Sequence, residues 1–181
     1  LKLDLKGLLY LPRIVKAAKL GDAAILKALI KILSENKIKV IKLNTFNPEL
    51  TLKKGVHTKI RPSKQEKDEI LKGITALKKI NSYNHTQAVI MRNNKVISLE
   101  KRKGTKEMIN SISKSLNKKG ILIKLPKAKQ DLRVDLPTIG LDTFKDCNKA
   151  GIKGIVVKSN QNIILNKKDS IKYANNNKIF I

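Results

Sequence analysis

The stretch LDTFKDCNKAGIKGIVVKSNQNIILNKKDSIKYANNNKIFI, residues 141–181, decides the fold class. Its pattern predicts helices over 142–150 and 168–176 and strands over 152–157, 162–166 and 178–181. Strands that alternate with helices are typical of an α/β sheet in which at least some strands run parallel. Ligands bind such sheets beyond the carboxyl ends of the strands, where loops lead into helices. We therefore expect the functional residues in loops of this kind.

The middle of the chain predicts further elements of the same unit. Ser63 and Glu66, three residues later, form a capping box at the start of a helix. Asn93 and Asn94 separate two short apolar runs, which indicates a β-hairpin with a tight turn. The elements predicted for this part are helices over 64–80 and 103–119 and strands over 88–92, 95–100 and 121–125.

The first fifty residues have mainly helical periodicity. Gly21 followed by Asp22 ends one helix and caps the next, and Pro12 suits the first turn of the earlier helix. A run with Asn, Pro and a pair of lysines then indicates a connection between two units. The predicted elements are helices over 11–19 and 22–37, a strand over 38–43 and an interdomain linker over 44–54.

The composition is that of a folded protein with a strongly basic surface. The 181 residues are 41% hydrophobic, enough for a core, and carry a formal net charge of +26. Such a charge suggests nucleic acid, anionic lipid or a phosphate-rich ligand. However, the lysines are scattered over every segment, and their enrichment together with Asn and Ile is also what drift in an AT-rich genome gives. With 3% aromatic residues available for base stacking, a nucleic-acid-binding module is the weakest interpretation.

The sequence contains neither a membrane segment nor a local catalytic signature. No window approaches the roughly 18 apolar residues of a membrane span, so we expect a soluble, cytoplasmic protein. A P-loop, a dinucleotide fingerprint, a zinc-ligand spacing and a nucleophile elbow are all absent. We interpret Cys147 as a packing residue and His57 and His85 as surface residues.

The loop KLPKAKQDLRVDLPTIG, residues 124–140, is the best candidate for a site, because it concentrates charge of both signs. Lys127, Gln130, Asp131, Arg133 and Asp135 lie within nine residues of one another. Cations that neutralise phosphate, and a carboxylate that binds a metal or orients water, would suit a phosphate site. The alternative is a local ion pair between the arginine and a neighbouring carboxylate, and the pattern leaves both open.

The same loop resembles a known family. QDLRVDLPTIG, residues 130–140, is similar to the Q-[DE]-x-R-x-D-x-P-T-[IV]-G block of LpxI-type UDP-2,3-diacylglucosamine pyrophosphatases. Other parts of that family are resembled, in the right order, by KLGDAAILKALI (19–30), TKIRPSKQEKDEI (58–70) and AGIKGIVV (150–157). The resemblance therefore covers nearly the whole chain.

The resemblance implies a domain organisation and a reaction. Residues 1–50 would be the remainder of an N-terminal Rossmann-like domain, whose start we expect to precede Leu1, and 53–181 an α/β C-terminal catalytic domain with a mixed sheet. The implied reaction is hydrolysis of UDP-2,3-diacylglucosamine to UMP and lipid X, the 1-phosphate of 2,3-diacylglucosamine, in the lipid A biosynthesis of a Gram-negative bacterium. A divalent cation, expected to be magnesium, a homodimer and peripheral contact with an anionic membrane surface are implied as well.

The resemblance also implies roles for particular residues. Asp135 is the expected essential carboxylate, as metal ligand or as the group that orients water, assisted by Arg133 and Gln130. Glu100, and also Asp131, would join it as metal ligands. The residues expected to bind the substrate are Lys127, Thr138, Gly140, Gln87, Gly104 and Thr105.

Three positions depart from the family's pattern. Lys103 and Lys106 stand where the family has acidic residues, and Asn84 stands where it has an aspartate. Ammonium groups near a magnesium site would repel the metal, or would bind phosphate oxygens directly. A degenerate member that binds the UDP-glycolipid without cleaving it is therefore the alternative function.

Overall fold

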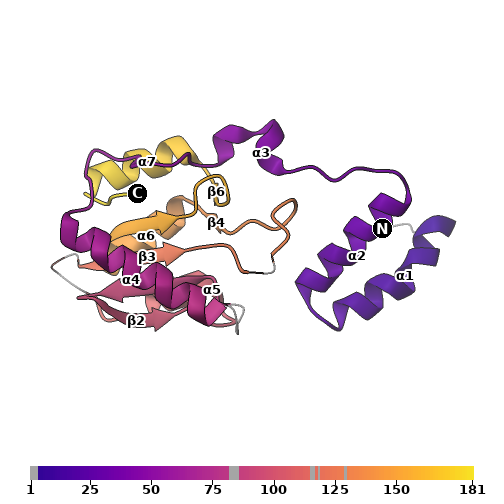
Figure 1. Ribbon diagram of the computed structural model, residues 1–181, viewed down its shortest axis with the longest axis horizontal. Coiled ribbons are helices and arrows are strands. Elements are labelled where there is room, and N and C mark those ends of the chain that lie inside the picture. The colour runs from indigo at the N-terminus through magenta and orange to yellow at the C-terminus, as the bar shows by residue number, and fades with distance from the viewer. Residues whose placement is uncertain (1–3, 82–85, 115–116, 118, 129) are drawn as a thin grey trace.

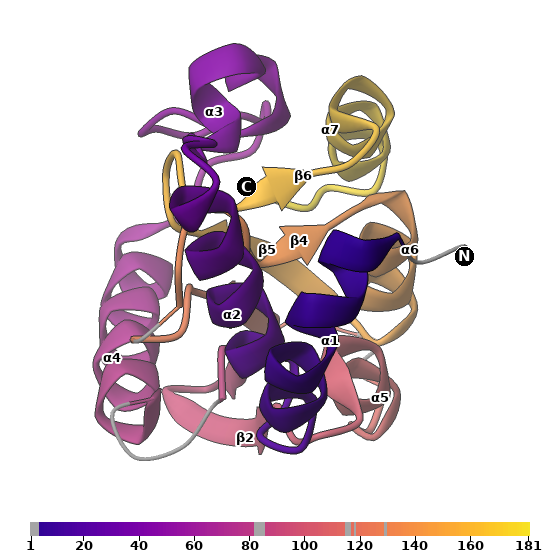
Figure 2. The same cartoon turned by 90° about the vertical axis from the view of Figure 1, so that its right-hand side faces the viewer.

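The computed structural model describes residues 4–81, 86–114, 117, 119–128 and 130–181, so Asn84 and His85 lie outside the described residues. An α/β unit contains most of the chain, and a helical hairpin stands beside it (Figure 1). Viewed from that side, the hairpin lies in front of the sheet (Figure 2). The hairpin is made of α1 (Leu5–Ala18) and α2 (Asp22–Glu35).

Four strands form a mixed sheet in the order β2-β1-β3-β5. β1 is antiparallel to β2 and to β3, and β3 is parallel to β5. The prediction of an α/β fold with a mixed sheet is therefore confirmed. The strands are β1 (Ala88–Arg92), β2 (Lys95–Leu99), β3 (Gly120–Lys124) and β5 (Ile152–Val157).

The predicted hairpin turn is present between β1 and β2. Asn93 and Asn94 both have positive φ, of 52° and 62°. Asparagine tolerates this left-handed conformation, which tight turns between twisted antiparallel strands require. The turn is tied to the neighbouring helix, because the backbone N–H of Asn94 donates to the buried carboxylate of Glu69 at 2.9 Å.

Helices cover both faces of the sheet, because alternate strand residues point to opposite sides. Val89 and Met91 of β1 pack with Leu77 of α4 (Lys64–Asn81). Ala88 and Ile90 pack into the larger cluster on the other face. That cluster is closed by α5 (Gly104–Asn110), α6 (Leu141–Lys149) and α7 (Lys167–Asn176).

The start of α4 is fixed by the predicted capping box. The Ser63 hydroxyl accepts the N–H of Glu66 at 3.3 Å, and the Glu66 carboxylate accepts the N–H of Ser63 at 2.6 Å. Lys153 also pairs with this carboxylate, at 2.7 Å. Burial raises the pKa of Glu66, but the bonds from Lys153 and Ser63 outweigh it and leave that pKa below its ordinary value. The box thereby anchors the helix to the β5 side of the sheet.

A second, two-stranded parallel sheet joins β4 (Thr138–Ile139) to β6 (Ile163–Ile164). β4 ends the candidate loop and leads directly into α6. Cys147 of α6 is fully buried in the core, as predicted for a packing residue. Burial raises the pKa of its thiol, and Asp146 adds to the effect.

The connection from the hairpin is more ordered than a plain linker. It contains α3 (Leu43–Phe46) and a 3-10 turn, η1 (Pro48–Leu50). Lys167 Nζ donates to the carbonyls of Glu49 and Thr51, each at 2.8 Å. The backbone N–H of Asn160 donates to Leu52 at 2.8 Å. This segment therefore packs on the α/β unit.

Several predicted boundaries are wrong. The strand over 38–43 is absent: Ile38 and Ile41 are exposed, and among the described residues no strand pairs with them. Pro12 lies inside α1 and not in its first turn, because Asp4 caps the helix earlier by accepting the N–H of Gly7 at 2.6 Å. The helix expected over 103–119 ends at Asn110, where the Ser111 hydroxyl donates to a helix carbonyl and competes with the backbone.

Two strands near the C-terminus are shorter than predicted. The strand over 162–166 is reduced to the two residues of β6, and the strand over 178–181 to one bridge between Gly154 and Phe180. The described residues of 4–50 form helices and no strand, so the Rossmann-like assignment of 1–50 stays a prediction.

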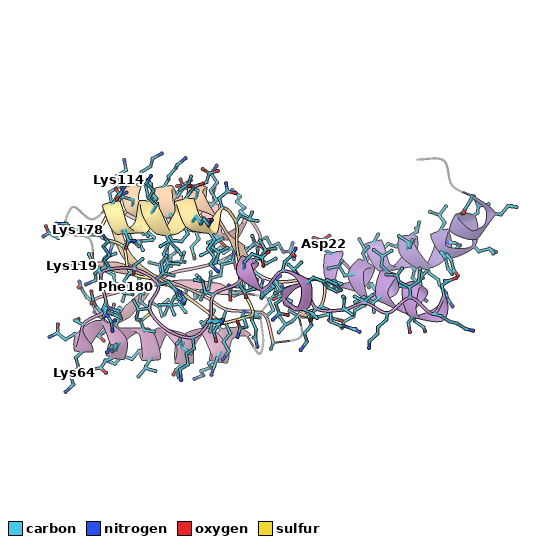
Figure 3. The ribbon with its side chains drawn as sticks, turned by 90° about the horizontal axis from the view of Figure 1, so that it is seen from above. Asp22, Lys64, Lys114, Lys119, Lys178 and Phe180 are labelled. Carbon is cyan, nitrogen blue, oxygen red and sulfur yellow. The ribbon has the colours of Figure 1, made fainter. Side chains whose placement is uncertain are left out.

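Basic side chains project from the whole molecule. Lys64, Lys114, Lys119 and Lys178 point outward at the end of the α/β unit far from the hairpin (Figure 3). Among the described residues, no helix combines the length and apolar character needed to cross a bilayer.

Candidate functional site

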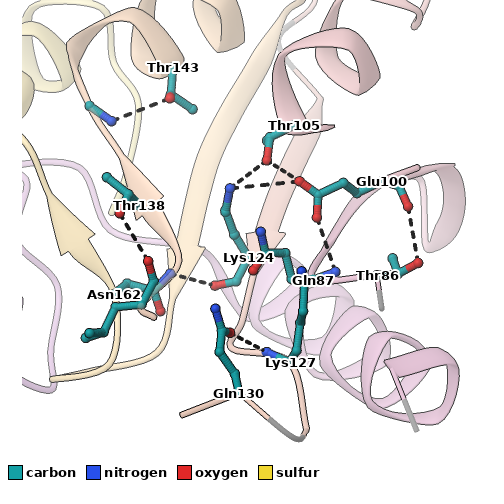
Figure 4. Close-up of polar contacts among 12 residues, drawn as sticks. Thr86, Gln87, Glu100, Thr105, Lys124, Lys127, Gln130, Thr138, Thr143 and Asn162 are labelled. Carbon is teal, nitrogen blue, oxygen red and sulfur yellow. Dashed lines mark hydrogen bonds and ion pairs between the residues drawn. The ribbon is translucent and has the colours of Figure 1, made fainter. Parts of the chain in front are cut away.

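The candidate site lies at the end of the sheet where β3 and β5 finish, the end that faces the helical hairpin (Figure 1). Because β1 is antiparallel to β2 and β3, its start and the end of β2 lie at this end too. Gln87 is therefore close to Lys124 and Glu100: its carbonyl accepts the N–H of Leu125 at 2.8 Å. Figure 4 shows how these side chains converge.

Glu100 is buried at this end, with 7% of its surface exposed. Its carboxylate accepts the Gln87 N–H at 3.2 Å and a short hydrogen bond from the Thr105 hydroxyl. The Lys124 ammonium lies 3.9 Å from the same carboxylate. The charge of Glu100 is thus compensated inside the protein.

Lys124, with 6% exposure, completes this cluster. Its ammonium donates to the Thr105 hydroxyl at 2.6 Å (Figure 4). Burial lowers the pKa of Lys124 and so does nearby Lys127, whereas Glu100 raises it; the net shift is downward. Asn162 holds the backbone here, donating to the Lys124 carbonyl at 3.2 Å and accepting the Lys158 N–H at 2.9 Å.

The loop after β3 is folded by its own polar residues. The Gln130 side-chain oxygen accepts the N–H of Lys127 at 2.8 Å. Arg133 donates to the Asp131 carboxylate through Nε at 3.0 Å and through a terminal nitrogen at 2.7 Å. These bonds from Arg133 lower the pKa of Asp131 to about 2. The local ion pair considered for this loop is therefore formed.

Asp135 differs from Asp131 in that its carboxylate has no partner among the described residues. Its backbone N–H donates to the Asp131 carbonyl at 2.9 Å. Within the part of the chain that the structure describes, its side chain makes no hydrogen bond or ion pair. Asp135 is half-buried, so its carboxylate is both shielded and available.

Thr138 and Gly140 connect the loop to α6. The Thr138 hydroxyl donates to the Leu136 carbonyl at 3.1 Å, and the Gly140 N–H donates to the Thr143 hydroxyl at 3.4 Å. A Cβ on Gly140 would lie 3.2 Å from Leu165 Cβ, so the glycine permits close approach to the chain beyond β6. These contacts fix the direction in which the loop leaves the sheet.

The segment before α5 carries the two lysines that replace acidic residues. Gly104 has a φ of +84°, which favours glycine, and places Thr105 in the first turn of α5. Lys103 is exposed and pairs with Glu107 at 3.7 Å. Lys106 is exposed as well. Both ammonium groups lie on the solvent side of the segment whose Thr105 points into the buried cluster.

The predicted metal ligands do not form one site in this structure. Asp131 pairs with Arg133, and Glu100 pairs with Lys124. Of the three predicted metal ligands, Asp135 is the one whose carboxylate has no partner among the described residues. Over residues 4–181, apart from the undescribed positions, no three His, Cys, Asp or Glu side chains lie close enough together to hold a metal ion. The magnesium ion therefore stays a prediction.

Two hollows adjoin the α/β unit. One, of about 440 Å³, runs along β5 and includes His57, which is half-buried and contacts the Lys53 carbonyl through its ring at 2.8 Å. The other, of about 630 Å³, lies between α2 and the candidate loop. Its charged lining residues are Lys27, Lys31, Glu35, Lys39, Asp131 and Arg133. The second hollow is mainly cationic and suits an anionic ligand.

The structure brings together Gln87, Glu100 and Thr105 from separate segments, and their roles in binding stay predictions. Lys124 and Asn162, which also belong to this cluster, were not predicted from the sequence as site residues. Lys124 has a sequence signal, because it is the one charged residue in the apolar strand ILIKL. Asn162 has none, since its hydrogen bond to the Lys124 carbonyl joins residues 38 positions apart in the sequence.

Comparison with known proteins supports the resemblance. Residues 53–181 match the LpxI C-terminal domain family. The chain is also 26% identical, over 186 aligned residues, to the UDP-2,3-diacylglucosamine pyrophosphatase LpxI of Caulobacter vibrioides. The alignment covers 98% of this chain and 66% of that relative, so the chain spans just under two-thirds of the relative's length. With most of its length matched in this way, the chain belongs to the LpxI C-terminal domain family.

Proposed function

We propose that this protein hydrolyses the pyrophosphate bond of UDP-2,3-diacylglucosamine and releases UMP and 2,3-diacylglucosamine 1-phosphate, a step of lipid A biosynthesis. One observation carries the proposal: the family's loop, which follows β3 and carries Asp135, contributes Asp131 and Arg133 to a mainly cationic hollow opposite α2. A relative of the same family bears the name of this activity.

The residues of the site would have different roles in the reaction. Water adds to one phosphorus of the anhydride, the bridging P–O bond breaks, and the proton of the water passes to the Asp135 carboxylate. The cationic side chains at the loop and α2 would neutralise the phosphate oxygens, where negative charge accumulates. Gln87, Lys127, Thr138 and the Gly104–Thr105 segment would orient the substrate, while Gln130 shapes the loop.

The test is UMP release by the full-length protein from UDP-2,3-diacylglucosamine, with and without magnesium. We expect Asp135→Ala to lower kcat by at least 100-fold, because it removes the proposed proton acceptor. Asp142→Ala is the matched control, since that carboxylate is 93% exposed at the start of α6. Full activity of Asp135→Ala would rule out this role for the loop. Loss of activity with EDTA, restored by magnesium, would establish the cation.

A degenerate member that binds the UDP-glycolipid without cleaving it is the alternative, motivated by Lys103 and Lys106. It predicts binding by calorimetry without UMP release at any magnesium concentration. A nucleic-acid-binding module would instead show affinity for DNA or RNA that falls steeply with salt. Cytoplasmic location, a homodimer and contact with an anionic membrane surface remain part of the proposal, to be tested by fractionation, light scattering and vesicle sedimentation.

A further inference from the structure

The buried cluster of Glu100, Thr105 and Lys124 joins three segments of the chain. Glu100 follows β2, Thr105 lies in the first turn of α5, and Lys124 ends β3. The Thr105 hydroxyl donates to Glu100 and accepts from Lys124, so its hydrogen-bonding directions are fixed by both partners (Figure 4). Lys124 is both the last residue of β3 and the first residue of the candidate loop over 124–140.

We propose that Lys124 is a positioning residue that serves as the internal counter-ion of Glu100 and holds the Gly104–Thr105 segment against the loop that carries Asp135. The inference rests on the proposed function and assigns Glu100 to this clamp instead of to a metal. The ammonium acts through Thr105 and Glu100 and does not need to touch the substrate.

Burial supports this role. The side chains of Lys124 and Glu100 are 8% and 7% exposed, so solvent screens their interaction poorly. A buried charge that loses its partner is strongly destabilised, whereas neutralising both partners costs much less. Each of the two charges is therefore stable in the interior only while the other is present. Loss of either one would free the start of α5 from the buried cluster.

The polar surroundings are those of a closed cluster. Glu100 receives the Gln87 N–H and the Thr105 hydroxyl in addition to the ion pair, and its backbone N–H donates to Ala88 at 3.0 Å. Asn162 fixes the Lys124 carbonyl from the β6 side. One carboxylate oxygen of Glu100 faces both the Thr105 hydroxyl and the Lys124 ammonium, and the other accepts the Gln87 N–H, so its charge is compensated inside the protein without a metal ion.

The experiment compares Lys124→Met, Glu100→Gln and the double variant in the full-length protein, with Lys145→Met as a surface control because Lys145 is 46% exposed. We expect each single variant to lower kcat at least tenfold with less than a threefold change in half-activating magnesium concentration. The double variant should recover at least threefold in kcat over either single variant. Its melting temperature should also exceed those of both single variants, because each single variant leaves one buried charge unpaired.

The outcomes separate the possibilities. A rise of tenfold or more in half-activating magnesium for Glu100→Gln alone, without recovery in the double variant, would make Glu100 a metal ligand and overturn the clamp. A second contrary result is that the single variants melt at lower temperatures but keep the wild-type kcat when assayed well below those temperatures. The cluster would then be purely structural, and the proposed positioning role of Lys124 would be overturned. If the wild type releases no UMP, the proposed function fails, and the melting temperatures alone still test the ion pair: additive changes refute it.

Discussion

Gly154 provides the sharpest test of how the sheet is packed. This residue lies in the middle of β5, opposite Phe180 across a parallel bridge. A Cβ at Gly154 would lie 2.0 Å from Phe180 Cζ and 2.3 Å from Cε2. The ring is buried, with 2% exposure, and lies inside the unit (Figure 3). The alanine variant therefore forces the ring or the strand to move.

The size of the effect follows from how firmly Phe180 is held. Its N–H donates to Lys153 at 3.0 Å, and its carbonyl accepts the Ile155 N–H at 2.9 Å. Moving the ring away strains these backbone bonds, so we expect the upper end of the usual cost of overpacking, about 3 kcal/mol. β5 leads to Lys158, whose N–H donates to the Asn162 side chain, and Asn162 in turn donates to the Lys124 carbonyl. For this reason kcat should fall as well.

The assay is equilibrium unfolding in urea, followed by circular dichroism, for Gly154→Ala, Phe180→Leu and the double variant. Leucine removes the ring atoms that clash, so the double variant should be at least 1 kcal/mol more stable than the sum of the single effects predicts. A Gly154→Ala protein within 0.5 kcal/mol of the wild type, or strictly additive effects, would refute the proposed contact.

Three further predictions concern polar groups. The Gln87 side-chain oxygen is buried without a partner among the described residues. Gln87→Met should therefore leave the melting temperature unchanged or raise it, and should raise KM about tenfold because a hydrogen bond to the substrate is lost. An unchanged KM would exclude a role for Gln87 in binding. Arg133 lowers the pKa of Asp131 from its ordinary 3.8 to about 2. The wild type should therefore be more stable than Asp131→Asn by a constant amount above about pH 4, and this difference should disappear as the pH falls to about 2. Thermal melts in which the difference does not change with pH would contradict this. Ser63→Ala should cost about 1 kcal/mol in urea unfolding by removing the cap of α4, Ser63→Asp should restore it, and equal stability of all three proteins would argue against the capping box.

Much of the α/β unit could be predicted from local pattern. The capping box at Ser63, the turn at Asn93 and Asn94 and the helices α4, α6 and α7 are each determined by neighbouring residues. The absent strand over 38–43 is the instructive error, because alternation predicts a strand only if another strand is available to pair with it. Ile38 and Ile41 have the pattern but no partner.

The candidate site likewise has a part that local sequence predicts and a part that depends on strand pairing. The loop over 124–140 could be noticed from its own charged residues, whereas the meeting of Glu100, Thr105 and Lys124 depends on sheet register. Ala88 pairs with Lys124, and this register places the ends of β2 and β3 at the same end of the sheet, on either side of the start of β1. No local pattern specifies that pairing. Lys124 could be noticed as a charge in an apolar strand, but its partners could not be named.

The lysines that replace acidic residues bear on whether the site can be catalytic. Lys103 and Lys106 are exposed, and Lys103 is paired with Glu107 on the surface. Exposed charges are screened by water and salt, so their effect at the buried Glu100 cluster is small. The third substitution, Asn84, lies outside the described residues. A test of the degenerate alternative should therefore start with Asn84→Asp: if the wild type binds the glycolipid without turnover and this variant gains it, position 84 accounts for the missing activity, and reversal of the two exposed lysines should add little.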